Sequence, residues 1–105
     1  MQLGRVVGTV VSTQKDPGVE GTRLLLVRLM TTEGVLLDSH LVATDVVDAG
    51  TGDVVMIATG SSARQTTVTD RRPVDAVIMA IVDTWEVGGA VKFDKALPEQ
   101  YPVGG

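Results

Sequence analysis

Apolar residues in this chain come in short runs, rich in β-branched side chains and separated by glycine, proline and aspartate. In residues 23–30, Leu25, Val27 and Leu29 recur at the two-residue period of a β-strand and form one apolar face. The run at 3–13 is apolar on both faces, as expected for a strand beside a barrel interior or a subunit boundary. The overall pattern predicts an all-β or mostly β fold. Further strands are predicted at 35–43 and 54–58.

Residues 74–85 fit two periodicities equally well. Ile78, Ile81 and Trp85 recur at helical spacing, whereas Ile78 and Ala80 alternate as they would in a strand. The valines and isoleucines of this segment favour a strand, because β-branched side chains pack well on a pleated surface. Periodicity alone leaves a helix open.

The C-terminal part of the chain predicts a hairpin. Gly88 and Gly89 lie between the segments TWEV and AVKF, and two glycines in this position are typical of a two-residue hairpin turn. A regular register would place Trp85 opposite Lys92, close enough for a cation–π contact.

With 105 residues, the chain is expected to form one compact domain. We place that domain at residues 1–93, followed by a tail at 94–105. Pro98, Pro102 and the terminal glycines predict a tail that is either disordered or laid across a neighbouring surface.

Composition argues against several classes of function. The formal net charge is −4 and aromatic residues make up 3% of the chain, so neither a basic stripe nor stacking rings for nucleic acid are expected. Arg64, Arg71 and Arg72 are too few to form such a stripe. The absence of cysteine excludes disulfides, thiolate metal sites and cysteine nucleophiles. No apolar run approaches the ~20 residues of a membrane-spanning helix, and the N-terminal run is too short for a signal peptide.

The segment DVVDAGTGD, residues 45–53, offers candidate chemistry. Its aspartates do not follow the spacing of a calcium loop. Gly50-x-Gly52 resembles part of a phosphate-binding loop, but such loops precede a helix, whereas the next residues here predict a strand. We therefore expect a tight turn, with a glycine at positive φ and aspartates bonded to their own backbone.

The segment GSSAR, residues 60–64, is not a nucleophile elbow, which needs glycine two residues after the serine. Ser61 or Ser62 is predicted to cap a short helical turn. Arg64 carries a planar fork of donors suited to carboxylates and carbonyls, and we expect it to bond across a subunit boundary. An anion site built from backbone N–H groups and Arg64 is the alternative. An enzyme using either serine would need His40, the one histidine of the chain, as its base.

Together, the segments VVSTQK, GTRLLLVR, LVATDVVDAGTGDVVMIATGSSAR and PVDAVIMAIVD resemble the vertex family of bacterial microcompartments. These are the pentameric shell proteins of carboxysomes and of ethanolamine-utilisation and related compartments. The match runs from residue 1 to about residue 85. It implies a small β-barrel of oligonucleotide-binding (OB) type, with residues 74–85 largely strand. It further implies a cytoplasmic, non-catalytic, cofactor-free homopentamer that closes the vertices of a shell whose facets are hexameric tiles.

The resemblance also implies which residues shape the subunit boundary and the five-fold axis. Two signature loops and the last family strand contain them: Asp45, Gly50, Gly52, Gly60, Ser61, Ser62, Ala63, Arg64, Asp75 and Asp83. Asp48 is a departure, because the family more often has glycine there, and we expect it to change the loop backbone or to add a ring of charge. A barrel of the same type that binds nucleic acid or a small anion is the alternative function.

Overall fold

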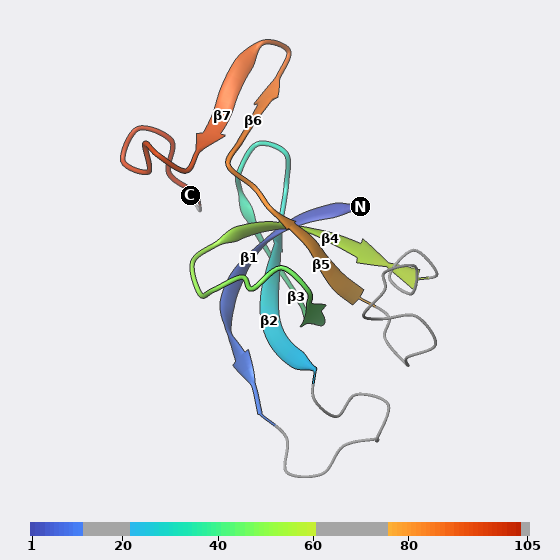
Figure 1. Ribbon diagram of the computed structural model, residues 1–105. Coiled ribbons are helices and arrows are strands. Elements are labelled where there is room, and N and C mark those ends of the chain that lie inside the picture. The colour runs from blue at the N-terminus through green and yellow to red at the C-terminus, as the bar shows by residue number, and fades with distance from the viewer. Residues whose placement is uncertain (12–21, 61–75, 104–105) are drawn as a thin grey trace.

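The computed structural model describes residues 1–11, 22–60 and 76–103, and shows a closed five-stranded β-barrel with a separate hairpin (Figure 1). The strands follow one another around the barrel in the order β1-β2-β3-β5-β4. They are β1 (Gln2–Val10), β2 (Arg23–Met30), β3 (Leu36–Asp45), β4 (Val54–Thr59) and β5 (Ala76–Ile81), with β6 (Thr84–Val87) and β7 (Ala90–Asp94) in the hairpin. The all-β barrel expected from the sequence is therefore confirmed. Among the described residues, none forms a helix long and apolar enough to cross a membrane.

The ambiguous segment is a pair of strands rather than a helix. β5 and β6 are separated by a break at Val82 and Asp83. β5 closes the barrel by pairing antiparallel with β4 and parallel with the end of β3, where Thr44 lies opposite Val77. Because both faces of β5 meet other parts of the chain here, its side chains are apolar at consecutive positions, which is why periodicity could not separate strand from helix.

The barrel interior is filled by aliphatic side chains that are at most 1% exposed: Val6, Leu25, Val27, Ala43, Val55, Ile57 and Ile78. Gly4 lies in the wall of the barrel against this core. A Cβ atom at Gly4 would come within 2.5 Å of Val27 Cγ1 and 3.1 Å of the Arg28 carbonyl oxygen. The close approach of β1 to β2 therefore requires glycine at this position.

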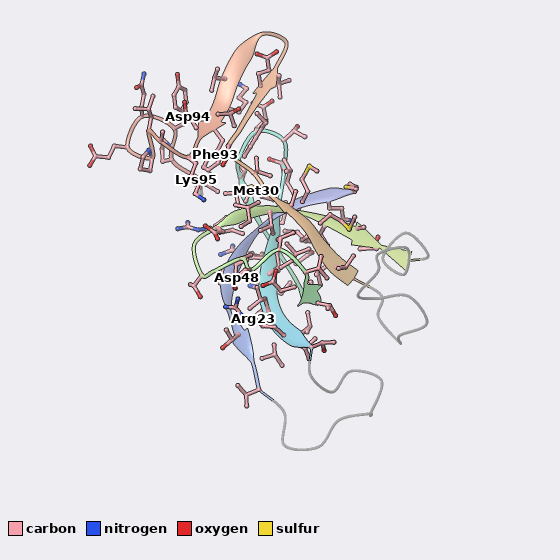
Figure 2. The ribbon with its side chains drawn as sticks, viewed as in Figure 1. Arg23, Met30, Asp48, Phe93, Asp94 and Lys95 are labelled. Atoms are coloured by element: carbon pink, nitrogen blue, oxygen red, sulfur yellow. The ribbon has the colours of Figure 1, made fainter. Side chains whose placement is uncertain are left out.

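A second apolar cluster lies between the outside of the barrel and residues 84–103, which we call the clasp (Figure 2). Met30 and Val54 of the barrel are buried there against Phe93 of β7 and Val82. Val103, near the end of the chain, packs on the same cluster. The described part of the tail thus lies across a surface of its own barrel.

The predicted pairing of Trp85 with Lys92 is wrong. A bulge between Trp85 and Glu86 shifts the register, so Trp85 lies opposite Phe93. The two rings stack with centroids 5.1 Å apart, and the Lys92 ammonium instead lies 2.9 Å from the Glu33 carboxylate. The shift brings both rings to the barrel side of the hairpin, where Phe93 is buried and Trp85 is partly buried, whereas a regular register would have left a ring paired with a charge.

Candidate functional site: the loop after β3 and the outer face of the barrel

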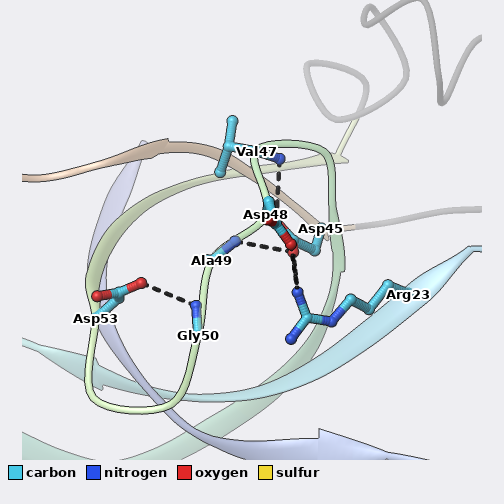
Figure 3. A network of polar contacts seen from close by, with 7 residues as sticks. All are labelled: Arg23, Asp45, Val47, Asp48, Ala49, Gly50 and Asp53. Carbon is cyan, nitrogen blue, oxygen red and sulfur yellow. Dashed lines mark hydrogen bonds and ion pairs between the residues drawn. The ribbon is translucent and has the colours of Figure 1, made fainter.

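Asp45, at the end of β3, organises the loop that leads into β4 (Figure 3). Its Oδ1 accepts a hydrogen bond from the Val47 N–H at 3.1 Å, and its Oδ2 accepts one from the Ala49 N–H at 3.0 Å. The Asp45 side chain is 1% exposed. The expectation of an aspartate bonded to its own backbone is confirmed, and it explains how a buried carboxylate is satisfied.

Arg23, the first residue of β2, pairs with two carboxylates of this loop. Its Nη1 lies 3.2 Å from Asp45 Oδ2 and 3.0 Å from Asp48 Oδ1. Arg23 and Asp45 face one another across the β2–β3 ladder, so the pair is a product of strand register. Sequence reasoning missed Arg23, because nothing local in residues 22–24 indicates a carboxylate more than twenty positions away.

Asp48 adopts a φ of 60°, the left-handed region that favours glycine. Asp48 thus takes a backbone conformation that glycine adopts readily, and the expectation that it changes the loop backbone or adds a ring of charge stays a prediction. Aspartate tolerates the conformation better than most residues. Gly52 has a φ of 95°, which confirms the predicted turn with a glycine at positive φ. The Gly50 N–H donates a hydrogen bond to Asp53 Oδ2 at 2.8 Å.

The loop is also fastened to β1. The Gly52 N–H donates to the Val6 carbonyl at 2.8 Å, and the Val6 N–H donates to the Asp53 carbonyl at 2.9 Å. These backbone bonds leave Gly50-x-Gly52 as a structural turn on the barrel wall. A phosphate cradle would need free N–H groups directed at a ligand.

The remaining predicted site residues lie elsewhere or outside the described part. Gly60 follows β4 with a φ of 65°. Asp83 lies at the base of the clasp, where its carbonyl accepts the Lys95 N–H at 2.7 Å. The short helical turn and Ser61, Ser62, Ala63, Arg64 and Asp75 lie outside the described residues.

The described residues include potential metal ligands and the one histidine of the chain. They contain no group of three or more potential ligands placed to hold a metal ion. His40 is exposed on β3, and its Nδ1 lies 3.2 Å from the carbonyl oxygen of Asp38. Ser61 and Ser62, the serines that an enzyme would pair with His40, lie outside the described residues.

A strip of apolar side chains runs across the outer face of β1, β2 and β3. Gly8 lies opposite Leu26, and Leu26 lies opposite Val42. Val42 is 47% exposed, and a Cβ atom at Gly8 would meet nothing within 4 Å. We call Gly8, Leu26 and Val42, with neighbouring Leu24, the outer strip. Gly8, Leu24 and Leu26 are partly exposed, and an apolar strip of this kind is a surface that another molecule can cover.

The family of this chain is shown by comparison with known families. The model of a family described as "Ethanolamine utilisation protein EutN/carboxysome" matches residues 1–83. The chain belongs to the EutN/CcmL family. The resemblance inferred from the sequence segments is therefore confirmed.

Curated relatives within the EutN/CcmL family match nearly their whole length. The carboxysome shell vertex protein CcmL of Nostoc sp. is 48% identical over 96 residues, covering 90% of this chain and 95% of that protein. The bacterial microcompartment shell vertex protein GrpN of Rhodospirillum rubrum is 46% identical over 86 residues, covering 82% of this chain and 97% of that protein.

Solved EutN/CcmL structures have the same fold. The structure of Gloeobacter violaceus CcmL superposes with a TM-score of 0.88 at 44% identity, and covers 91% of this chain and 99% of that one. The GrpN structure from Rhodospirillum rubrum, described as a pentameric microcompartment shell protein, superposes with a TM-score of 0.75 at 44% identity, covering 83% and 100%.

Proposed function

We propose that this chain assembles into a cyclic homopentamer that caps the vertices of a bacterial microcompartment shell. Its support is the near full-length match to proteins named shell vertex proteins, one of which has a structure described as pentameric. Flat sheets of hexameric tiles make facets, and pentagons provide the curvature that closes a polyhedron. The protein would act in the cytoplasm, as part of the shell.

The outer strip supports assembly on physical grounds. The barrel interior is closed within a single protomer, yet Val42 is exposed and Leu24 and Leu26 are partly exposed on its outer face. A ring uses one surface of each protomer against a different surface of the next, and closes without leaving either surface free. An obligate interface of this kind buries on the order of 2,000 Å² in total and is apolar at its centre.

The loop residues take their roles within this proposal. We place Asp45, Asp48, Gly50 and Gly52 near the subunit boundary or the five-fold axis, together with Gly60 and the residues 61–64. Arg64 is proposed to bond across the boundary, and Asp75 and Asp83 to flank it. Hexameric shell proteins are the proposed partners.

The proposed role is structural, without catalysis, metal or cofactor. The relatives are named as shell vertex proteins, and the His40 contact offers no acid–base pair within the described residues. A nucleic-acid or anion-binding module as the main function receives no support from the relatives.

The test is the mass of the purified protein by native mass spectrometry, which should give five protomers. Val42→Arg places a charge in the outer strip and should yield smaller species with an unchanged circular dichroism spectrum. Val91→Arg is the matched control, because Val91 is 42% exposed on β7, outside the outer strip, and its variant should remain pentameric. A stable wild-type monomer, or a pentameric Val42→Arg protein, would contradict the proposal.

A further inference from the structure

A cavity of about 320 Å³ lies between the barrel wall and the clasp. Val54 of β4 and Phe93 of β7 form an apolar part of its lining, and both are at least nine-tenths buried. Two cations line it as well, Arg5 from β1 and Lys95 just after β7. Tyr101 and neighbouring residues of the tail also line the cavity. Figure 2 shows Phe93 and Lys95 at the junction of the clasp with the barrel.

The charges of this cavity are unbalanced. The Lys95 ammonium lies 3.7 Å from Asp53 Oδ1, so that cation has a carboxylate partner. Arg5 makes no side-chain hydrogen bond or ion pair with any residue of the described ranges. The contrast with Arg28 is direct, because Arg28 lies opposite Arg5 on β2 and has Asp38 as its partner at 3.5 Å. The cavity therefore carries one uncompensated positive charge.

The geometry points to a binding site for a small organic monocarboxylate with an apolar body, and we propose this ligand class for the cavity. The guanidinium of Arg5 presents parallel N–H donors that match a carboxylate. The side chains of Val54 and Phe93 suit the apolar body of such a ligand. The lining presents polar and apolar surface in similar amounts, so a matching ligand needs both a charged group and an apolar body.

Charge and size select this class over other anions. One net positive charge is balanced by a monoanion, whereas a phosphate dianion would leave excess negative charge beside Asp53. The volume is at the small end of the range of ligand pockets, roughly 300–1,000 Å³, which favours a compact metabolite over a nucleotide. The apolar wall predicts that an aromatic or branched carboxylate binds more tightly than acetate.

The inference does not rest on the proposed function. The cavity is lined by residues of one protomer, from β1, β4 and its preceding loop, and the clasp, and none of the outer strip residues that carry the assembly argument is among them. A failure to form pentamers would leave the cavity in place, and a failure to bind carboxylate would leave the pentamer in place. The two proposals can therefore fail separately.

The binding test uses isothermal titration calorimetry on the intact protein, with benzoate as the probe. Acetate tests the apolar wall, inorganic phosphate tests the charge selection, and benzylamine tests the sign of the charge. Benzoate is expected to bind at least about tenfold more tightly than acetate or phosphate, and benzylamine should not bind. Because Trp85 is the single tryptophan and stacks on Phe93, benzoate should also change its fluorescence.

Arg5→Gln should weaken benzoate binding about tenfold or more, because a charge-assisted hydrogen bond is lost. Arg28→Gln is the matched control, with the same substitution on the opposing strand, and should bind benzoate like the wild type. Native mass spectrometry of Arg5→Gln should give the wild-type mass.

Four results would overturn the proposal. Benzoate could fail to bind the intact wild-type protein, or could bind Arg5→Gln with unchanged affinity. Alternatively, Arg5→Gln could lose its oligomeric state, which would make Arg5 a contact with another subunit. Tighter binding of phosphate than of benzoate would replace the monocarboxylate with a different ligand class.

Discussion

The interior of the barrel and the junction between barrel and clasp are two cores built in different ways. The interior contains aliphatic side chains from five strands and is sealed by a closed ladder of hydrogen bonds. The junction combines Met30, Val82 and Phe93 with the partly buried Trp85. The clasp forms its own two-stranded sheet and contributes no strand to the barrel, so its attachment depends mainly on side-chain contacts.

Polar contacts at the junction are few and specific. The Trp85 Nε1–H donates to the Thr32 carbonyl at 2.7 Å, and Lys92 pairs with Glu33 in the same β2–β3 turn. The Lys95 N–H donates to the Asp83 carbonyl. The family model ends at residue 83, immediately before β6. The barrel is thus the part of the chain that the family model matches, while the clasp is held by a few contacts that single substitutions can remove.

The largest effect is expected from Ile57→Ala, which leaves a cavity in the barrel interior. Ile57 is fully buried, and truncation of such a side chain costs about 4 kcal/mol of unfolding free energy. Denaturant unfolding at one fixed protomer concentration measures the loss. Val91→Ala, on the exposed face of β7, is the control and should stay within about 0.5 kcal/mol of wild type. Equal losses in the two variants would show that the barrel interior is no more sensitive to truncation than an exposed position of the clasp.

Phe93→Ala should damage the clasp and spare the barrel. The ring is 8% exposed and stacks on Trp85, so its removal should cost about 3 kcal/mol. Hydrogen exchange should show lost protection in β6 and β7, with the amides of β1–β5 still protected. Phe93→Leu keeps most of the apolar volume and should cost less than about 1.5 kcal/mol. Loss of protection throughout the barrel would show that the two cores unfold as one unit.

Trp85→Phe should have the smallest effect of the three, because it keeps the ring stack and removes the hydrogen bond to the Thr32 carbonyl. A loss of about 1 kcal/mol is expected, and hydrogen exchange of residues 84–94 should rise modestly. Lys92→Met, which removes the half-exposed ion pair with Glu33, is the comparison variant and should change exchange less. A larger effect of Lys92→Met would make charge, and not the indole, the main polar attachment of the clasp.

Much of the barrel could be predicted from the sequence. The alternation of Leu25, Val27 and Leu29 correctly predicted β2 and its inward face. The two glycines at 88 and 89 correctly predicted the β6–β7 turn, and Gly52 the positive-φ turn before β4. These features are local, because side-chain periodicity and glycine φ preferences act over a few neighbouring residues.

The candidate sites were predicted less completely. Asp45 and Asp48 were identified from their loop, but their shared cation Arg23 was not, because it comes from another strand. The sequence did not indicate Arg5 and Lys95 as parts of one site, because ninety positions separate them. Their common cavity exists because β1 and the start of the tail lie on the same side of the barrel.

The strand-forming runs, the tight turns and the family follow from the order of the amino acids, since each depends on neighbouring residues and their conformational preferences. The tertiary structure alone decided the register that stacks Trp85 on Phe93, the ion pairs of Arg23 and the unpaired charge of Arg5. Register and barrel closure are set by the burial of side chains far apart in the chain, and a one-residue bulge reassigns every neighbour beyond it.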